Sequence, residues 1–362
     1  MRSTSSTSAG TRVRALALAG AVAGAGCQAE RPKPAPTKVA AEPEQPIPEP
    51  APEPAPEPKP ARARFDVHVH LVSDAVDPLL ATLDRAGIQR AVVLASPHLD
   101  PAHLPDQSER FADWRGANDR LLELSAGHRD RLVPFITADP AEARPEELRA
   151  WFDAGACGVK LYMGHRSFHA RPLADEAHRP MFSTLERERV PVLLHINTFR
   201  FEAELGELLA SYPELNLLCP HFCGSRTDVE RLERILAAHP GLLVDTSHGP
   251  GKPGVQGFTA LELERERVRA LILAEPERFL FGSDLVTSMV EQREDIARFE
   301  WDRQVQANLG LLEADRFEFN RLVGEHGVME WSEYRGLALD DATLGPVLAG
   351  NAERWLASCL DE

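Results

Sequence analysis

Positive charge is scarce in this chain, and the scarcity excludes two classes of partner. Its 362 residues include 40 Lys and Arg against 56 Asp and Glu, which gives a formal net charge of −16. Proteins that bind nucleic acid carry a basic footprint, and proteins held at an anionic lipid surface carry clusters of Lys and Arg. We therefore expect neither nucleic acid nor a polybasic membrane patch to be involved, and the partner we predict is a small-molecule substrate.

Cysteine is also sparse, and the motif C-x-x-C is absent. The five cysteines are Cys27, Cys157, Cys219, Cys223 and Cys359. C-x-x-C is the spacing of thiol redox motifs and of many zinc sites, so neither is indicated here. Cys219 and Cys223 flank His221, and a bond between them is permitted in an exported protein. We interpret the pair instead as small buried apolar residues.

The N-terminus lacks a transmembrane segment and carries a targeting segment in its place. Three arginines precede the apolar stretch 15–26, which is too short to span a bilayer and is typical of a signal peptide. Residues 23–27, Ala-Gly-Ala-Gly-Cys, resemble the lipobox of bacterial lipoproteins, except that Gly24 replaces the usual aliphatic residue. The resemblance implies that 1–27 is a signal peptide and that Cys27 is lipidated. An ordinary secretory signal is the alternative.

Residues 28–62 are too poor in large apolar side chains to build a core. Proline recurs through them, with Glu, Ala and Lys between, and such segments adopt extended polyproline structure. At about 3.1 Å per residue the proline-rich part would reach up to roughly 90 Å. We interpret 28–62 as a disordered linker between Cys27 and a folded domain over 63–362. The chain is then an exported protein, lipid-anchored at the periplasmic or outer-membrane face of a bacterial envelope.

Eight short apolar segments alternate with amphipathic stretches such as 145–154 and 226–239. The segments are 65–70, 89–95, 132–138, 156–162, 191–197, 215–221, 242–246 and 278–284. Continuous apolar runs are typical of strands covered on both faces. Alternation of this kind predicts an α/β fold, a parallel (β/α)8 TIM barrel with its active site at the C-terminal ends of the strands. An open doubly wound sheet alternates similarly.

The pattern changes after the eighth segment. Residues 285–331 are long, charged and helical in period, as in 292–300 and 311–323. They predict a helical excursion over the barrel mouth, which is either a lid or an exposed insertion. Residues 341–360 predict a final amphipathic helix on the barrel wall.

Residue types that bind metals recur at the ends of the predicted strands. His68 and His70 lie two positions apart, so a strand turns both to one face, about 6 to 7 Å apart along the backbone. That spacing suits one ion. The fourth, fifth, sixth and eighth segments supply Lys160, His195, His221 and Asp284. One such residue is commonly a half-buried polar side chain, but six at one rim predict a metal site.

Several short motifs together resemble the amidohydrolase superfamily, and within it the amidohydrolase 2 branch that includes aminocarboxymuconate-semialdehyde decarboxylase. They cover nearly all of residues 63–358 in the family's order. The matching stretches are Phe-Asp-Val-His-Val-His at 65–70, 118–135, Gly-Val-Lys-Leu at 158–161, His195, His221, Val-Asp-Thr-Ser at 244–247, Phe-Gly-Ser-Asp at 281–284 and Gly-Asn-Ala-Glu-Arg at 350–354. The resemblance implies a metal-dependent TIM barrel of the hydrolase type.

The resemblance also implies roles for the strand-end residues. His68, His70, His195 and Asp284 would bind one divalent ion, and His221 would act beside it as an acid, base or electrophile. In binuclear members of the superfamily a lysine at the place of Lys160 is carboxylated and bridges two ions. His195 and His221 would then both bind the second ion. The sequence leaves one metal or two as alternatives.

The chemistry of this donor set favours a hydrolase. Imidazole and carboxylate suit Zn²⁺, although several divalent ions fit, and such an ion activates water and polarises a carbonyl. Asp284 would carry the proton as general base and then general acid. We predict a hydrolase of a small amide, lactone or ester. The alternatives are a non-oxidative decarboxylase with the same metal and a surface lipoprotein that only binds a ligand. The substrate and the oligomeric state stay open.

Overall fold

A computed structural model of the chain describes residues 62–72, 74–99, 111, 113–248, 257–287, 294–323 and 328–360. The predicted signal peptide, Cys27 and all but the last residue of the predicted linker lie outside these ranges. Within them, no helix is both long enough and apolar enough to cross a membrane.

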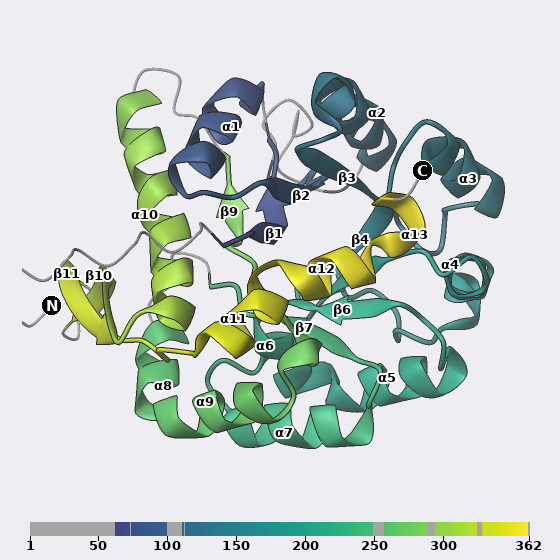
Figure 1. Cartoon of the computed structure of the whole chain (residues 1–362). Coiled ribbons are helices and arrows are strands. Elements are labelled where there is room, and N and C mark those ends of the chain that lie inside the picture. The colour runs from purple at the N-terminus through teal and green to yellow at the C-terminus, as the bar shows by residue number, and fades with distance from the viewer. Residues whose placement is uncertain are drawn as a thin grey trace, which may run out of the picture. The chain divides into compact units, whose positions relative to one another are not determined.

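The predicted (β/α)8 barrel is confirmed: the main sheet is parallel and its strands follow one another in chain order (Figure 1). The strands are β1 (Phe65–His70), β2 (Arg90–Leu94), β3 (Leu132–Thr137), β4 (Gly158–Gly164), β5 (Val192–Ile196), β6 (Leu217–Cys219), β7 (Leu243–Asp245), β8 (Phe279–Leu280) and β9 (Leu285–Val286). Their side chains are almost all buried, as expected for strands with helices outside and a packed barrel interior inside.

The barrel closes through a single broken strand. β8 pairs with β7, and β9 pairs with β1, so the two short strands form the two ends of the eighth barrel strand. Between them, the Val67 N–H donates to the carbonyl oxygen of Phe281 at 3.0 Å. The break includes Asp284, whose φ of 54° lies in the left-handed region. The interruption therefore turns the Asp284 carboxylate away from the path of a regular strand.

Helices connect the strands and surround the sheet. They are α1 (Val76–Arg85), α2 (Trp114–Ser125), α3 (Pro145–Asp153), α4 (Arg179–Arg187), α5 (Thr198–Ser211), α6 (Pro220–Gly224), α7 (Val229–Ala238), α8 (Gly257–Leu263), α9 (Arg265–Ala274) and α10 (Glu294–Glu313), with 3₁₀ turns at Ala126–His128, Glu176–His178 and Pro276–Arg278.

The ends of α3 lie close to the range 145–154 predicted from the sequence, because local signals define both ends. Pro145 begins it, Glu147 accepts from the Arg144 N–H, and Gly155 follows it with a φ of 100° that favours glycine.

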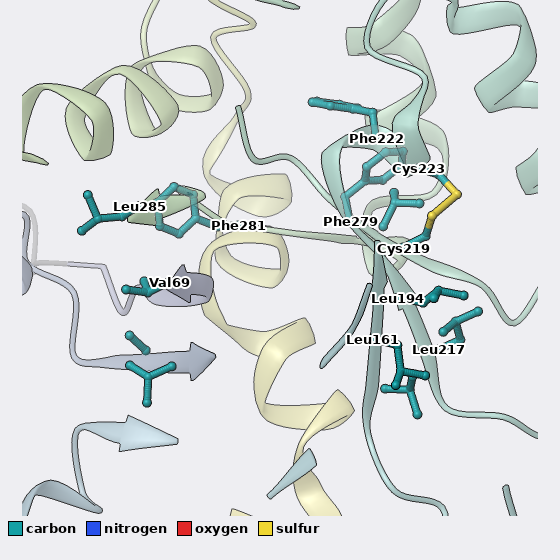
Figure 2. Packing of buried hydrophobic residues seen from close by; sticks show 14 of the residues in the cluster. Val69, Leu161, Leu194, Leu217, Cys219, Phe222, Cys223, Phe279, Phe281 and Leu285 are labelled. Atoms are coloured by element: carbon teal, nitrogen blue, oxygen red, sulfur yellow. A yellow bond between two sulfur atoms is a disulfide. The ribbon is translucent and has the colours of Figure 1, made fainter. Parts of the chain in front are cut away.

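The core has two layers. The larger lies between the strands and the surrounding helices, and Figure 2 shows the part of it around Phe279 and Phe281. The smaller fills the barrel interior, where Phe65, Phe135 and Leu218 pack against Trp355. Trp355 belongs to the C-terminal segment, α11 (Asp341–Gly345), a π-helical turn (Pro346–Gly350), α12 (Asn351–Trp355) and α13 (Ala357–Leu360).

The C-terminal segment and the excursion after β8 differ from their predictions. The segment is a series of short helices that covers the end of the barrel interior, because its apolar face meets the inward side chains of the strands. α10 confirms a helix after β8 and packs against α1 on the barrel wall. The predicted helical period over 316–323 is wrong. Phe317 and Phe319 alternate with exposed or half-buried polar residues, so this stretch forms strand β10 (Arg316–Val323), paired with β11 (Val328–Arg335).

Two disulfides correct the interpretation of the cysteines. Cys157, just before β4, is bonded to Cys359 in α13, with their Cα atoms 5.4 Å apart. Cys219, the last residue of β6, is bonded to Cys223 with Cα atoms 4.7 Å apart. Both distances are usual for disulfides. The first bond ties the C-terminal segment to the barrel, and the second encloses the turn that holds His221.

Candidate metal centre

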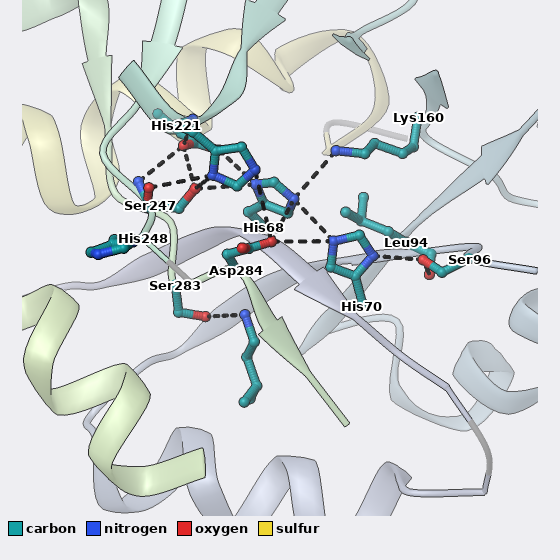
Figure 3. Close-up of polar contacts among 12 residues, drawn as sticks. His68, His70, Leu94, Ser96, Lys160, His221, Ser247, His248, Ser283 and Asp284 are labelled. Atoms are coloured by element: carbon teal, nitrogen blue, oxygen red, sulfur yellow. Dashed lines mark hydrogen bonds and ion pairs between the residues drawn. The ribbon is translucent and has the colours of Figure 1, made fainter. Parts of the chain in front are cut away.

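Three imidazoles and one carboxylate meet at the C-terminal ends of β1 and β6 and at the break between β8 and β9 (Figure 3). The Nε2 atoms of His68 and His70 are 3.2 Å apart. Oδ1 of Asp284 lies 3.4 Å from each of them and 4.0 Å from Nε2 of His221. One ligand-type atom from each of His68, His221 and Asp284 lies within 4.8 Å of the other two. The structure thus brings four of the six predicted residues together, and the other two, Lys160 and His195, lie beside them.

Asp245, at the end of β7, orients His68 and His221 together. Its Oδ2 lies 2.8 Å from Nδ1 of His68, and its Oδ1 accepts the backbone N–H of His221 at 2.7 Å. Oδ1 also accepts the Ser247 hydroxyl at 2.6 Å. Since Ser247 donates to Asp245, its oxygen is left to accept from Nδ1 of His221 at 2.9 Å. Both rings then carry their proton on Nδ1 and turn the Nε2 lone pair inward.

His70 is oriented from the other side of the centre. Its Nδ1 lies 2.6 Å from the Ser96 hydroxyl, which follows β2. The Ser96 oxygen also lies 2.8 Å from the hydroxyl of Tyr162, in β4, and 3.2 Å from the Leu94 carbonyl. A Ser96 proton given to that carbonyl leaves the serine oxygen to accept from His70. Nε2 of His70 is then also an unprotonated donor atom.

Burial keeps these histidines neutral. It lowers the pKa of both His68 and His70 to about 4 and lowers that of His221 as well. Burial alone would raise the pKa of Asp284, but the favourable contacts of its carboxylate with His221 and His70 lower it well below the usual value. At neutral pH the centre therefore offers neutral imidazole nitrogens and an ionised carboxylate, the protonation states that metal binding requires.

The backbone around Asp284 is fixed by buried polar contacts. Oδ1 of Asp66 accepts the N–H of Ser283 and the N–H of His68, both at 3.0 Å. The carbonyl of Ser283 accepts from Gln304 and Asn308 of α10, at 3.0 and 3.1 Å. α10 thus supports the break in the eighth strand from outside.

Lys160 and His195 line the same centre. Nζ of Lys160 lies 3.3 Å from Nε2 of His68, and burial lowers the pKa of this lysine to about 7 against the pull of Asp284. The His195 ring lies edge-on to the His221 ring, with centroids 5.1 Å apart. The metal-binding role of His195 and the bridging role of Lys160 remain predictions.

The geometry fits a divalent cation. Two unprotonated Nε2 atoms that face each other at 3.2 Å repel, because neither has a hydrogen to share. A carboxylate oxygen stands near both, and all three histidines are held by hydrogen bonds on the far side of the ring. A cation among these atoms would turn repulsion into coordination, and nitrogen and oxygen donors of this kind suit Zn²⁺.

Sequence reasoning missed the residues that orient the ligands. Asp245 had a signal, since it ends an apolar segment as His195 and Asp284 do. Ser247 belongs to the Val-Asp-Thr-Ser motif at 244–247, but the motif does not say which ring it contacts. Ser96 and Tyr162 carried no signal for this role, because only the fold shows which ring a hydroxyl meets. Tyr162 also lines a pocket of about 160 Å³ with Phe111 and Phe168, and Asp139 and Arg171 add charged groups to its wall. Because the Tyr162 hydroxyl lies 3.4 Å from Nδ1 of His70, this pocket adjoins the centre.

Known proteins share this architecture. The sequence profile of the family described as Amidohydrolase matches residues 65–357. No curated protein is significantly similar to the chain in sequence. Solved structures that resemble it include a protein from Pseudomonas putida assigned as a 2-pyrone-4,6-dicarboxylic acid hydrolase, at a TM-score of 0.54 and 17% identity over 82% of this chain and 98% of that one.

Two further solved structures resemble this chain about as closely. The 4-oxalomesaconate hydratase of Rhodopseudomonas palustris has a TM-score of 0.52 and 15% identity over 82% of this chain and 96% of that one. An amidohydrolase from Burkholderia multivorans with bound zinc has a TM-score of 0.52 and 15% identity over 82% and 99%. At these identities the likeness shows the fold.

Proposed function

Because the chain belongs to the Amidohydrolase family, we propose that it is a metal-dependent hydrolase of a small amide, lactone or ester. The observation that carries the proposal is the convergence of the Nε2 atoms of His68, His70 and His221 on one Asp284 oxygen. A similarly folded amidohydrolase holds zinc, which supports Zn²⁺ as the ion. His68, His70 and Asp284 would hold it, with His195 or His221 as the fourth ligand.

When bound, the ion supplies a Lewis acid that polarises the substrate carbonyl and makes a nearby water acidic. Asp284 accepts the proton of the attacking water, since its low pKa keeps it ionised. It then returns that proton to the leaving nitrogen or oxygen. His221, held by Asp245 and Ser247, faces the same point with an unprotonated Nε2, so it can accept a proton as a second base or hold the ion as the fourth ligand.

A substrate panel tests the reaction. We expect the Zn²⁺-loaded protein to open a lactone or cleave an amide or ester, and to release an acid together with an alcohol or amine. Mass spectrometry of the products and a CO₂ assay on carboxylated phenols and enols read the outcome. Release of CO₂ without hydrolysis would assign the protein as a decarboxylase instead of a hydrolase. A wild-type chain that binds no metal and turns over no substrate would leave ligand binding as the remaining function.

We also propose that the enzyme is exported and lipid-anchored. The signal-like residues 1–27 support export, and two disulfides in the described part of the chain suit an oxidising compartment. Mass spectrometry of the mature N-terminal peptide should show Cys27 as the first residue with an added lipid. A Cys27→Ser chain should leave the membrane fraction. Mature protein that begins elsewhere, or an unmodified Cys27, would contradict the anchor.

A further inference from the structure

Arg226 is a charged residue near the centre that the mechanism does not use. It follows α6, five positions after His221, and it is half-buried. Burial lowers its pKa, and the charges of Asp284 and Asp245 act on it from nearby. Among the described residues it forms no ion pair, whereas Arg231 on the next helix is paired with Asp228 at 3.0 Å.

A neutral ring holds this guanidinium in place. Nη1 of Arg226 donates to Nδ1 of His248, three residues after β7, at 2.9 Å. Burial and the charge of Arg226 lower the pKa of His248 well below its usual value, so the ring accepts and carries no charge. The ring lies edge-on to Phe258, and a side chain at Gly257 would collide with it at 2.9 Å. Packing thus fixes His248, and His248 fixes one edge of Arg226.

The remaining N–H groups of Arg226 have no partner among the described residues, so they are available to an anion. A guanidinium presents five N–H groups in a fork that matches a carboxylate. A partly desolvated cation whose one side-chain partner is a neutral ring is unfavourable, and an anionic ligand would offset that cost. Both Arg226 and His248 follow the C-terminal ends of strands, at the same end of the barrel as the candidate metal centre.

We propose that Arg226, oriented by His248, binds a carboxylate on the substrate, so that the substrate is a small carbonyl compound with a separate carboxylate group. This inference rests on the proposed hydrolase, in which the reacting carbonyl lies at the metal. The carboxylate would fix the far end of the same molecule. Removing it from the substrate would then weaken binding and misplace the carbonyl.

Carboxylate probes test the subsite without the natural substrate. The full-length Zn²⁺-loaded chain is titrated by calorimetry with acetate and with the dicarboxylates succinate, glutarate and adipate. One carboxylate of each can meet the metal, but only a dicarboxylate can also reach Arg226. We expect at least one dicarboxylate to bind about tenfold or more tightly than acetate, the size of a hydrogen bond to a charged group. Arg226→Gln should remove that advantage and change acetate binding less than about threefold.

Matched variants separate this subsite from general charge effects and from the metal. Arg234→Gln removes an exposed guanidinium from α7 and should bind every probe as the wild type does. Arg226→Lys keeps the charge without the fork and should lose part of the advantage. In the wild type, the tight dicarboxylate, and not acetate, should protect Arg226 from modification by phenylglyoxal, a readout that does not depend on a variant's folding.

Two results would overturn the subsite. One is a wild type that binds no dicarboxylate more tightly than acetate, and the other is an Arg226→Gln chain that keeps the advantage. The proposed hydrolase fails differently, through a chain that binds no Zn²⁺ in the same calorimeter.

Discussion

Replacing His68 and His70 together with alanine should abolish metal binding and lower kcat/KM by at least about a thousandfold, the size expected when groups that act in the transition state are removed. Their two Nε2 atoms, 3.2 Å apart, are the closest pair of candidate donors in the described centre. Zinc content by elemental analysis and kcat/KM on the best substrate of the panel measure both effects. His128→Ala, which alters a half-buried histidine outside the centre, is the matched control.

Three single variants divide the roles within the centre. Asp284→Asn keeps an oxygen but cannot carry a proton, so kcat should fall far more than zinc content. Asp245→Asn removes the acceptor of the His68 ring proton and should weaken zinc binding about 10- to 100-fold. His195→Ala should lose the ion if His195 is a ligand. His221→Ala would lose it instead if that histidine holds the fourth position.

A double variant of His68 and His70 that retains stoichiometric zinc would refute the assignment of these histidines as ligands. Full activity of the metal-free wild type would refute the need for an ion. Thermal melting of the double variant beside the wild type and the control distinguishes loss of the ion from loss of folding.

The sequence predicted the barrel and the strand-end residues well because both follow from local rules. A buried parallel strand reads as an apolar run, and the residue that follows it lies at the rim whatever the rest of the chain does. The bounds of β1 and the positions of His68 and Asp284 needed no further information. The role of each residue at the rim depends on which side chains from other strands it contacts.

The features that the sequence did not predict depend on contacts between distant residues or on an unusual backbone conformation. Asp245 meets His68 across 177 positions, and the Cys157–Cys359 bond spans 202. No local pattern encodes either contact. The 316–323 stretch carries both an alternating and a helix-like pattern, and pairing with β11 favours the alternating one. The left-handed turn at His221 had no signal, because left-handed residues are normally glycine and this turn has only one.

That turn leads to a second large expected effect: reduction of the Cys219–Cys223 bond should displace His221. Four consecutive residues, His221 to Gly224, have φ between 52° and 64°. For the three that are not glycine, this backbone costs roughly 1 to 2 kcal/mol each. The disulfide joins the two ends of the turn, and the Cys223 carbonyl accepts from Thr198 at 2.6 Å. Figure 2 shows the bond beside Phe222.

We expect Cys219→Ala/Cys223→Ala to lower kcat about 10- to 100-fold, the usual consequence of a misplaced catalytic group, and to alter the absorption spectrum of the Co²⁺-substituted protein. Cys219→Ala/Cys223→Gly should recover most of the loss, because glycine adopts the left-handed backbone without the bond. Cys157→Ala/Cys359→Ala removes the other disulfide and should lower the melting temperature without changing kcat. If the alanine variant at 219 and 223 equals the wild type, or if glycine gives no recovery, the disulfide has no part in holding His221.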